Sequence, residues 1–340
     1  MTTSSSRAVR AGLALVVLLA MTGCSGAGDD PAMRPTPGTA GGTQSPTPQG
    51  WFAVAPALLQ LTEVAAASFG GELWVVGGLD TRGQAARDVQ VYDPDMDTWE
   101  PGPELLDPLH HTALVAAPDG LLLIGGYRGP GFDAPSAQVW RLDSATGDWQ
   151  EAPPLPEPRA AGAAAWDGEQ IVYAGGVGSD LRVRDDVFAL RGDVWTRVAA
   201  LRAPREHLGA ASDGNGRVWF LGGRRGDLST NTGVVDILRD GQITHGPSLP
   251  TPRGGAAAFW SSETGACLIG GEAASGTFST VECVDAAGEV RTLPAMAQPR
   301  HGLGVAVVDG IAYAALGGPT PGLSSTAIVE ALALEALASD

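Results

Sequence analysis

Trp74-Val75-Val76-Gly77-Gly78 is the first of six short apolar runs that end in paired glycines. The other doublets are Gly125-Gly126, Gly175-Gly176, Gly222-Gly223, Gly270-Gly271 and Gly317-Gly318. Their first glycines follow one another at intervals of 48, 50, 47, 48 and 47 residues. A repeat of this length indicates a chain built from copies of one supersecondary unit. We therefore expect six similar units along the body of the chain.

Other features keep step with the doublets and divide each unit into four short strands. A Pro-Arg pair precedes the doublet in four units, at Pro158-Arg159, Pro204-Arg205, Pro252-Arg253 and Pro299-Arg300. Units one and two have Leu61-Thr62 and Pro108-Leu109 in its place. A run of small residues predicts the first strand, the apolar run before the doublet the second, and a segment such as 89–93 the third. A Trp marks the fourth strand in the first three units only, at Trp99, Trp149 and Trp195.

Four short strands repeated about every 50 residues resemble the kelch family. The resemblance covers residues 51–340 and implies an all-β fold, a six-bladed β-propeller of four-stranded blades. Blades are expected near 58–103, 104–154, 155–202, 203–249, 250–296 and 297–340. Residues 51–55 resemble a fourth strand, so we expect them to join the last blade and close the ring. Closure would cover a sheet edge that otherwise invites aggregation.

The N-terminal residues have the features of an export signal. Arg7 and Arg10 precede an apolar run over 11–21, and Met21-Thr22-Gly23-Cys24 resembles the lipobox of bacterial lipoproteins. That resemblance implies that residues 1–23 are a signal peptide and that Cys24 is lipidated. Residues 24–50, rich in Pro, Gly and Thr, are expected to form a disordered tether. The protein is therefore expected to be exported and lipid-anchored to the cell envelope.

Composition and charge limit the partners. Of the 340 residues 44% are apolar, which is enough for a core, and the formal net charge is −17. An excess of negative charge argues against binding to nucleic acid or to anionic lipid surfaces. We expect an envelope protein or a glycan as the partner, membrane contact through the lipid anchor, and a monomer.

Two cysteines fall on neighbouring predicted strands of the fifth unit. Cys267 lies on the second strand and Cys283 on the third, at equal distances from a loop centred near Ser275. In an exported protein such thiols oxidise, so we predict a disulfide between them. Two buried free thiols are the alternative, because Cys packs well as a small apolar residue.

Four of the five histidines follow the Pro-Arg position closely, namely His110, His111, His207 and His301. With Glu206 they are expected near one mouth of the central channel, as polar groups that line a ligand site. Imidazole is a ligand for Zn, Cu and Fe. However, these histidines occupy two successive strand positions, which face opposite ways. We therefore predict neither a metal site nor a cofactor, and purely structural roles remain the alternative.

Arginines form the other candidate set. Four lie on the loops between second and third strands, where binding residues often sit, namely Arg128, Arg182, Arg224 and Arg225. Solvated turns are the alternative for these four. The four Pro-Arg arginines recur at one structural position. That recurrence favours hydrogen bonding between blades or pairing with acidic neighbours over a basic ring that binds an anion.

The sequence contains no nucleophile elbow, phosphate-binding loop, His-Glu-x-x-His or Cys-x-x-Cys pattern. We therefore favour a non-enzymatic binding scaffold for a protein or glycan, and the polar loops weigh against a purely structural envelope protein. The alternative is a sugar-active enzyme of the kelch-like sialic-acid mutarotase type, since mutarotation needs only an acid and a base, and Glu206, His207 and His301 carry such groups. A resemblance to galactose oxidase would imply copper and a Cys linked to Tyr, and Cys283 has no evident Tyr partner.

Overall fold

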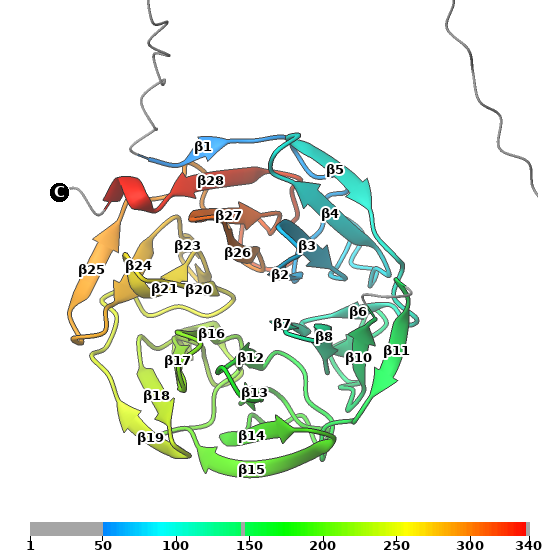
Figure 1. Ribbon diagram of the computed structural model, residues 1–340, viewed down its shortest axis with the longest axis vertical. Coiled ribbons are helices and arrows are strands. Elements are labelled where there is room, and N and C mark those ends of the chain that lie inside the picture. The colour runs from blue at the N-terminus through cyan, green and yellow to red at the C-terminus, as the bar shows by residue number, and fades with distance from the viewer. Residues whose placement is uncertain (1–49, 144–146, 338–340) are drawn as a thin grey trace, which may run out of the picture. The chain divides into compact units, whose positions relative to one another are not determined.

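The computed structural model describes residues 50–143 and 147–337, which form six four-stranded antiparallel sheets around a central axis (Figure 1). The predicted signal peptide, Cys24 and the tether up to residue 49 lie outside the described residues. No helix among the described residues is long and apolar enough to cross a membrane. The predicted six-bladed β-propeller is confirmed.

Each blade runs from an innermost strand to an outermost one. The first three blades are β2 (Ala65–Phe69), β3 (Glu72–Val76), β4 (Val89–Asp93), β5 (Thr98–Pro101); β7 (Ala113–Ala117), β8 (Gly120–Ile124), β10 (Val139–Leu142), β11 (Trp149–Ala152); and β12 (Ala163–Trp166), β13 (Ile171–Ala174), β14 (Asp186–Arg191), β15 (Val194–Ala200). The last three are β16 (Gly209–Ser212), β17 (Arg217–Leu221), β18 (Val235–Arg239), β19 (Gln242–His245); β20 (Ala257–Ser261), β21 (Gly265–Ile269), β24 (Val281–Val284), β25 (Val290–Leu293); and β26 (Gly304–Val308), β27 (Ile311–Ala315), β28 (Val329–Ala333), β1 (Phe52–Ala53). The remaining elements are two two-stranded sheets and two 3-10 helices, namely β6 (Leu109–His110) with β9 (Tyr127–Arg128), β22 (Glu272–Ala273) with β23 (Gly276–Thr277), η1 (Leu228–Thr230) and η2 (Glu335–Leu337).

The ring closes through the N-terminal strand, as predicted. β1 pairs with β28, with Phe52 opposite Ala331, and lies on the outside of the last blade in Figure 1. Just before β1, Trp51 donates its Nε1–H to the carbonyl of Pro294 in the fifth blade at 2.8 Å. Trp99, Trp149 and Trp195 each make the same bond to the preceding blade. The expectation that the sixth unit lacks this Trp was therefore wrong, because the N-terminal strand supplies it.

Small residues let the innermost strands meet around the axis. β2, β7, β12, β16, β20 and β26 contact one another in a closed sequence. A Cβ added at Gly209 would lie 2.6 Å from the Cβ of Ala258 in the next blade. Larger residues would therefore push the blades apart where they converge.

The glycine doublets join each blade to the next. Gly78 donates its N–H to the carbonyl of Leu109 at 2.8 Å, and a Cβ on Gly77 would lie 2.5 Å from that oxygen. In the sixth blade, Leu316-Gly317 occupies the doublet position, with φ angles of 60° and 90°. The prediction of Gly317-Gly318 was therefore one residue out of register, although Gly317 still donates to Leu61 and closes the ring.

The core is divided among the junctions between blades, and six apolar clusters each combine residues of two adjacent blades. The four recurrent arginines lie within single blades, each at most 1% exposed. They pair with acidic residues of their own third strands, namely Arg159 with Asp186, Arg205 with Asp236, Arg253 with Glu282 and Arg300 with Glu330. Their pairing with acidic neighbours is confirmed, and their guanidinium groups also bond backbone carbonyls of the same blade. The expected bonding between blades is made by their backbone, because the carbonyl of each arginine accepts an N–H from the glycine doublet of the preceding blade.

The fifth blade contains a disulfide. Cys267 on β21 lies directly opposite Cys283 on β24, and their sulfur atoms are 1.99 Å apart. Both residues are fully buried in the apolar cluster between the fifth and sixth blades.

Candidate functional site

One residue just before each innermost strand adopts a left-handed backbone conformation. These six residues, which we call the channel ring, are Glu63, His111, Ala161, His207, Gly255 and Gly302, with φ between 52° and 64°. From His111 to Gly302, each member donates its N–H to the carbonyl of the member in the preceding blade, at 2.8 to 3.1 Å. This conformation is costly for residues other than Gly, and such strain is concentrated at functional sites.

Glu63 is in the channel ring because of the register of the first blade. The sequence comparison aligned Thr62 with the recurrent arginines, and this was wrong by one residue. The carbonyl of Leu61 accepts from a doublet glycine, as the carbonyls of Leu109 and Arg159 do, so Leu61 is the true counterpart. The residue two positions later, Glu63, therefore corresponds to His111 and His207.

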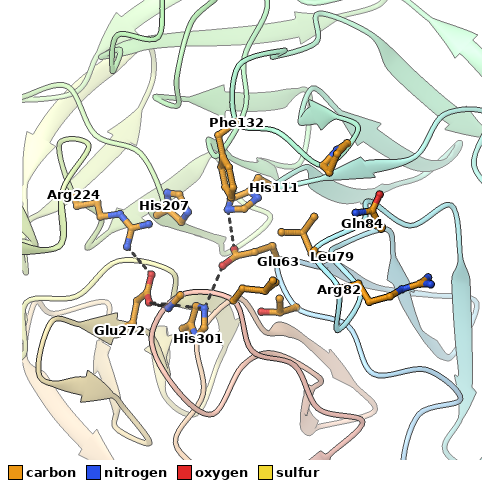
Figure 2. Close-up of a pocket in the computed structure, with 15 residues that line it drawn as sticks. Glu63, Leu79, Arg82, Gln84, His111, Phe132, His207, Arg224, Glu272 and His301 are labelled. Atoms are coloured by element: carbon orange, nitrogen blue, oxygen red, sulfur yellow. Dashed lines mark hydrogen bonds and ion pairs between the residues drawn. The ribbon is translucent and has the colours of Figure 1, made fainter.

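A pocket of about 530 Å³ opens above the channel ring. Its floor holds charged and imidazole side chains that point toward one another from five blades (Figure 2), namely Glu63, His111, His207, Arg224, Glu272 and His301. Its rim is formed by loops that follow second strands and includes two exposed apolar side chains, Phe132 and Leu323. The pocket thus combines a charged floor with an apolar rim.

The hydrogen bonds of His110 define how His111 faces the pocket. His110 Nε2 lies 3.1 Å from the carbonyl oxygen of Gly131, so this nitrogen carries the proton that is donated. His110 Nδ1 then accepts from His111 Nδ1–H at 2.6 Å, with one proton on each ring. His111 consequently directs the lone pair of Nε2 toward Glu63 Oε2, which is 3.2 Å away (Figure 2).

His301 approaches the same carboxylate from the sixth blade. Its Nδ1 lies 3.1 Å from the carbonyl of Gly318, which can only accept, so Nδ1 carries a proton. Its Nε2 faces Glu63 Oε1 at 3.5 Å and Glu272 Oε2 at 3.8 Å. Glu63 therefore has an imidazole nitrogen beside each of its two oxygens.

Arg224 links the two other carboxylates of the site. Its Nε donates to Glu206 Oε1 at 2.9 Å and its Nη1 to Glu272 Oε1 at 2.8 Å. The second oxygen of Glu206 contacts His207 Nδ1. All these side chains are at most 12% exposed. Together with Glu63, the site therefore holds three carboxylates of low exposure and one guanidinium group.

Burial controls the protonation of the imidazoles. Desolvation, followed by the charge of Arg224, lowers the pKa of His111 to about 3. Desolvation and the proximity of His111 lower the pKa of His110 to about 4. Desolvation and Arg224 also hold the pKa of His207 well below its usual value. These three rings are therefore neutral at pH 7.

A second, smaller cavity of about 80 Å³ is lined by the channel ring and the residues that follow it. Glu63, His111 and His207 line both this cavity and the pocket above it. These three side chains therefore stand between the mouth and the channel.

The structure brings together some of the predicted site residues and separates others. His111, His207, His301 and Arg224 line the pocket, and His110 and Glu206 contact residues that do. The remaining three lie outside its lining: Arg128 bonds Gln138, Arg182 is 83% exposed beside Asp180, and the backbone of Arg225 bonds Thr230.

Sequence reasoning missed the other residues of the pocket. Correct alignment of the first unit would have revealed Glu63. Glu272 lies on β22 directly after the fifth glycine doublet, the position that Arg224 has in the fourth unit, so comparison of the repeats would have revealed it too. Phe132 lies in a loop that does not repeat between units.

Comparisons with known proteins agree with this architecture. Residues 61–106 match the Kelch motif family model. Human "Kelch repeat and BTB domain-containing protein 13" is 32% identical over 145 residues, which cover 42% of this chain and 30% of that protein. Human "Kelch-like protein 34" is 30% identical over 170 residues, 46% of this chain and 26% of that protein. "Kelch-like protein terF" of Aspergillus terreus is 28% identical over 323 residues, 84% of this chain and 68% of that protein.

The matched segments span less than a third of the two human proteins, so the likeness concerns the repeats rather than the whole proteins. The motif match falls on the first blade, and the longest alignment runs through most of the described residues. The motif, these relatives and the six four-stranded blades together support one identity for this chain, a kelch-repeat β-propeller.

Proposed function

We propose that this protein is an exported, lipid-anchored kelch propeller that acts as a binding scaffold and holds a protein or a glycan at the mouth of its channel. The observation that carries the proposal is the pocket of about 530 Å³ above the channel ring. This volume lies in the range of ligand sites and suits a sugar ring or a few side chains of a partner. Kelch propellers commonly serve as scaffolds for protein binding, which agrees with this reading.

The rim supplies the means of contact. Phe132 and Leu323 are 55% and 56% exposed, and large apolar side chains beside a pocket are typical anchors at interfaces. An aromatic face also stacks on a sugar ring, while the carboxylates and Arg224 below it are partners for hydroxyl groups. The floor is held rigid by its own ion pairs, so a ligand would meet a preformed surface.

A sugar-active enzyme of the mutarotase type is the second candidate, favoured by the position of Glu63 between His111 and His301. Burial lowers the pKa of His111 to about 3, which makes this imidazole a weak general base at pH 7. A binding scaffold needs no general acid or base at this position, so we prefer it to the enzyme. Mutarotation is tested by following the interconversion of sugar anomers by NMR, with Glu63→Gln as the inactive control.

Export and lipid anchoring are supported by the sequence of residues 1–24. Cys24→Ala tests them, because the variant should leave the membrane fraction and fail to incorporate labelled palmitate. An unchanged distribution between membrane and soluble fractions would reject the anchor without affecting the proposed pocket.

Binding is tested at the rim with photo-crosslinking residues placed at Phe132 and, as a control, at Val194. Val194 is also exposed, at 62%, but lies on the outermost strand of the third blade. We expect Phe132 alone to crosslink to a defined envelope protein, or a sugar to raise the unfolding temperature in a manner lost in Phe132→Ala. Equal crosslinking from both positions, with no response to any sugar, would reject the proposal.

A further inference from the structure

Three side chains of the channel ring converge on one point. Glu63, His111 and His207 each place one carboxylate oxygen or imidazole nitrogen so that the three atoms lie within 4.8 Å of one another. The three residues come from the first, second and fourth blades and line both the pocket and the smaller cavity at the channel ring. We propose that they bind one divalent transition-metal ion, of the class of Zn²⁺, between the pocket and the channel.

The spacing suits a single ion. Zinc bonds to imidazole nitrogen and carboxylate oxygen are about 2.0–2.2 Å long, so two ligands of one ion lie up to about 4 Å apart. The three side chains therefore reach a common ion with less than about 1 Å of movement. Side-chain torsions supply such a movement without disturbing the backbone ring.

The orientation of the imidazoles points the same way. His111 Nε2 faces Glu63 Oε2 across 3.2 Å, while its Nδ1 is engaged by His110. Nε2 is therefore the nitrogen that is left for an ion bound by Glu63 as well. His110 holds the ring of His111 in this orientation and bonds Gly131 in turn, which is the outer-shell arrangement typical of metal-binding histidines.

The charge of the buried cluster also favours a divalent cation. Glu63, Glu206 and Glu272 carry three negative charges against the single positive charge of Arg224. Two more carboxylates than guanidinium groups therefore lie in a site where charges are costly unless they are paired. One divalent ion balances them.

The donor set selects the class of metal. Imidazole nitrogen suits Zn, Fe, Ni and Cu, whereas Ca²⁺ and Mg²⁺ prefer oxygen ligands only. Three protein ligands leave a fourth position on a tetrahedral ion for water or a ligand from the pocket. His301 lies beside the second oxygen of Glu63 at 3.5 Å, where it helps to position this carboxylate.

The backbone of the channel ring is conformationally strained at the three proposed ligands. Glu63, His111 and His207 adopt φ angles of 54°, 53° and 52°, whereas Gly255 and Gly302 fill the same position in the last two blades. Glycine takes this conformation without strain, so the fold itself does not require any side chain there. Of the four ring residues that bear this strain, all but Ala161 carry a side chain that can ligate a metal ion.

The test is a titration of the purified full-length protein, prepared without a polyhistidine tag and freed of metal with a chelator, with Zn²⁺ alone. Isothermal titration calorimetry should show one saturable site per chain. His111→Gly and His207→Gly should each weaken binding at least about 100-fold, because the loss of an outer-shell partner alone costs 10- to 100-fold. Glu63→Gln, which keeps the shape of the side chain, should have a similar effect.

Two controls separate the site from the fold and from the acidic surface. Ala161→Gly changes the same ring position in the third blade without removing a ligand and should bind as the parent does. His245→Gln removes an exposed histidine on β19 and should also bind normally. Circular dichroism checks that all variants are folded. Absence of a saturable site in the parent, or unchanged affinity in folded His111→Gly and His207→Gly, would overturn the proposal. Because no sugar or protein partner is present, the result is independent of the proposed scaffold function.

Discussion

The guanidinium of Arg300 and the carboxylate of Glu330 lie 2.7 Å apart inside the sixth blade, with side-chain exposures of 0% and 4%. Arg300 also donates to the carbonyls of Leu316 and Ile328, and Glu330 accepts from the backbone of Ala297. The pair thus ties the start of the blade to its second and third strands. Its counterparts in three other blades show that this is a general device of the fold.

Removal of one partner should be costly. Arg300→Met leaves the carboxylate of Glu330 buried without its cation, and breaking a buried pair in this way costs about 3–5 kcal/mol. Urea unfolding measures the loss. The matched control is Arg82→Met, which breaks an exposed pair with Asp80 and should change stability by less than about 1 kcal/mol. Similar losses of unfolding free energy in both variants would show that the buried pair stabilises the fold no more than the exposed pair does.

Backbone strain in the channel ring is measurable at Ala161. Its φ is 55°, a conformation that costs a residue with a Cβ roughly 1–2 kcal/mol and costs Gly nothing. Ala161→Gly should therefore leave stability unchanged or raise it by up to about 1 kcal/mol, after the entropic penalty of Gly. Ala164→Gly, on the neighbouring strand β12, should instead lower it by about 0.5–1 kcal/mol. Equal losses of unfolding free energy in Ala161→Gly and Ala164→Gly would show that the backbone at Ala161 is not strained.

The disulfide of the fifth blade should contribute to stability in solution. It closes a loop between Cys267 and Cys283, which are 16 residues apart, and a loop of this size is worth about 3 kcal/mol in the chain-entropy model. Dithiothreitol should lower the free energy of unfolding by roughly 2–4 kcal/mol. A variant with both cysteines replaced by alanine should not respond to the reductant. A parent protein that is equally indifferent to it would argue against the bond.

Stability at acid pH should depend on Asp97. This carboxylate accepts the N–H of Ala55 at 2.8 Å and the O–H of Tyr92 at 2.7 Å, and these bonds hold the pKa of Asp97 below 3.8. Its contribution is therefore present in full above pH 3.8 and is lost as the pH falls through the folded-state pKa. Asp97→Asn should be less stable than the parent at pH 7, and the difference should vanish below that pKa. A difference independent of pH, measured by urea unfolding from pH 7 to pH 3, would refute this account.

The fold was predictable because its determinants are local and repeat. Position 77 must be glycine because a Cβ there would collide with the carbonyl of Leu109. The innermost strands need small side chains, and the Trp of the outermost strand must reach the preceding blade. Each requirement recurs at nearly the same spacing, so the period is visible without a structure. The two register errors arose in the first and sixth blades, where Leu61 replaces the arginine and Leu316 replaces the first glycine.

The site was less predictable because it is assembled across blades. The histidines were recognisable from their common position, but Glu63 was hidden by the register error in the first blade. Glu272 of the fifth blade and Arg224 of the fourth occupy equivalent positions, 48 residues apart and directly after their glycine doublets, so the repeat places them in adjacent blades. The repeat does not specify that these two side chains carry opposite charges, nor that Phe132 enters the pocket, because the residues and loops at the mouth differ from blade to blade.

The closing strand also determines how the propeller would respond to mechanical force. β1 pairs with the last blade through Phe52 and Ala53, the residues after it add backbone bonds from Val54 and Ala57, and Trp51 bonds across to Pro294. A force applied to the chain before Trp51 acts first on β1, which is shorter than the other strands of the six blades. The load would detach β1 before it reached the buried arginines, so the propeller would open at the sixth blade while the other five remained intact.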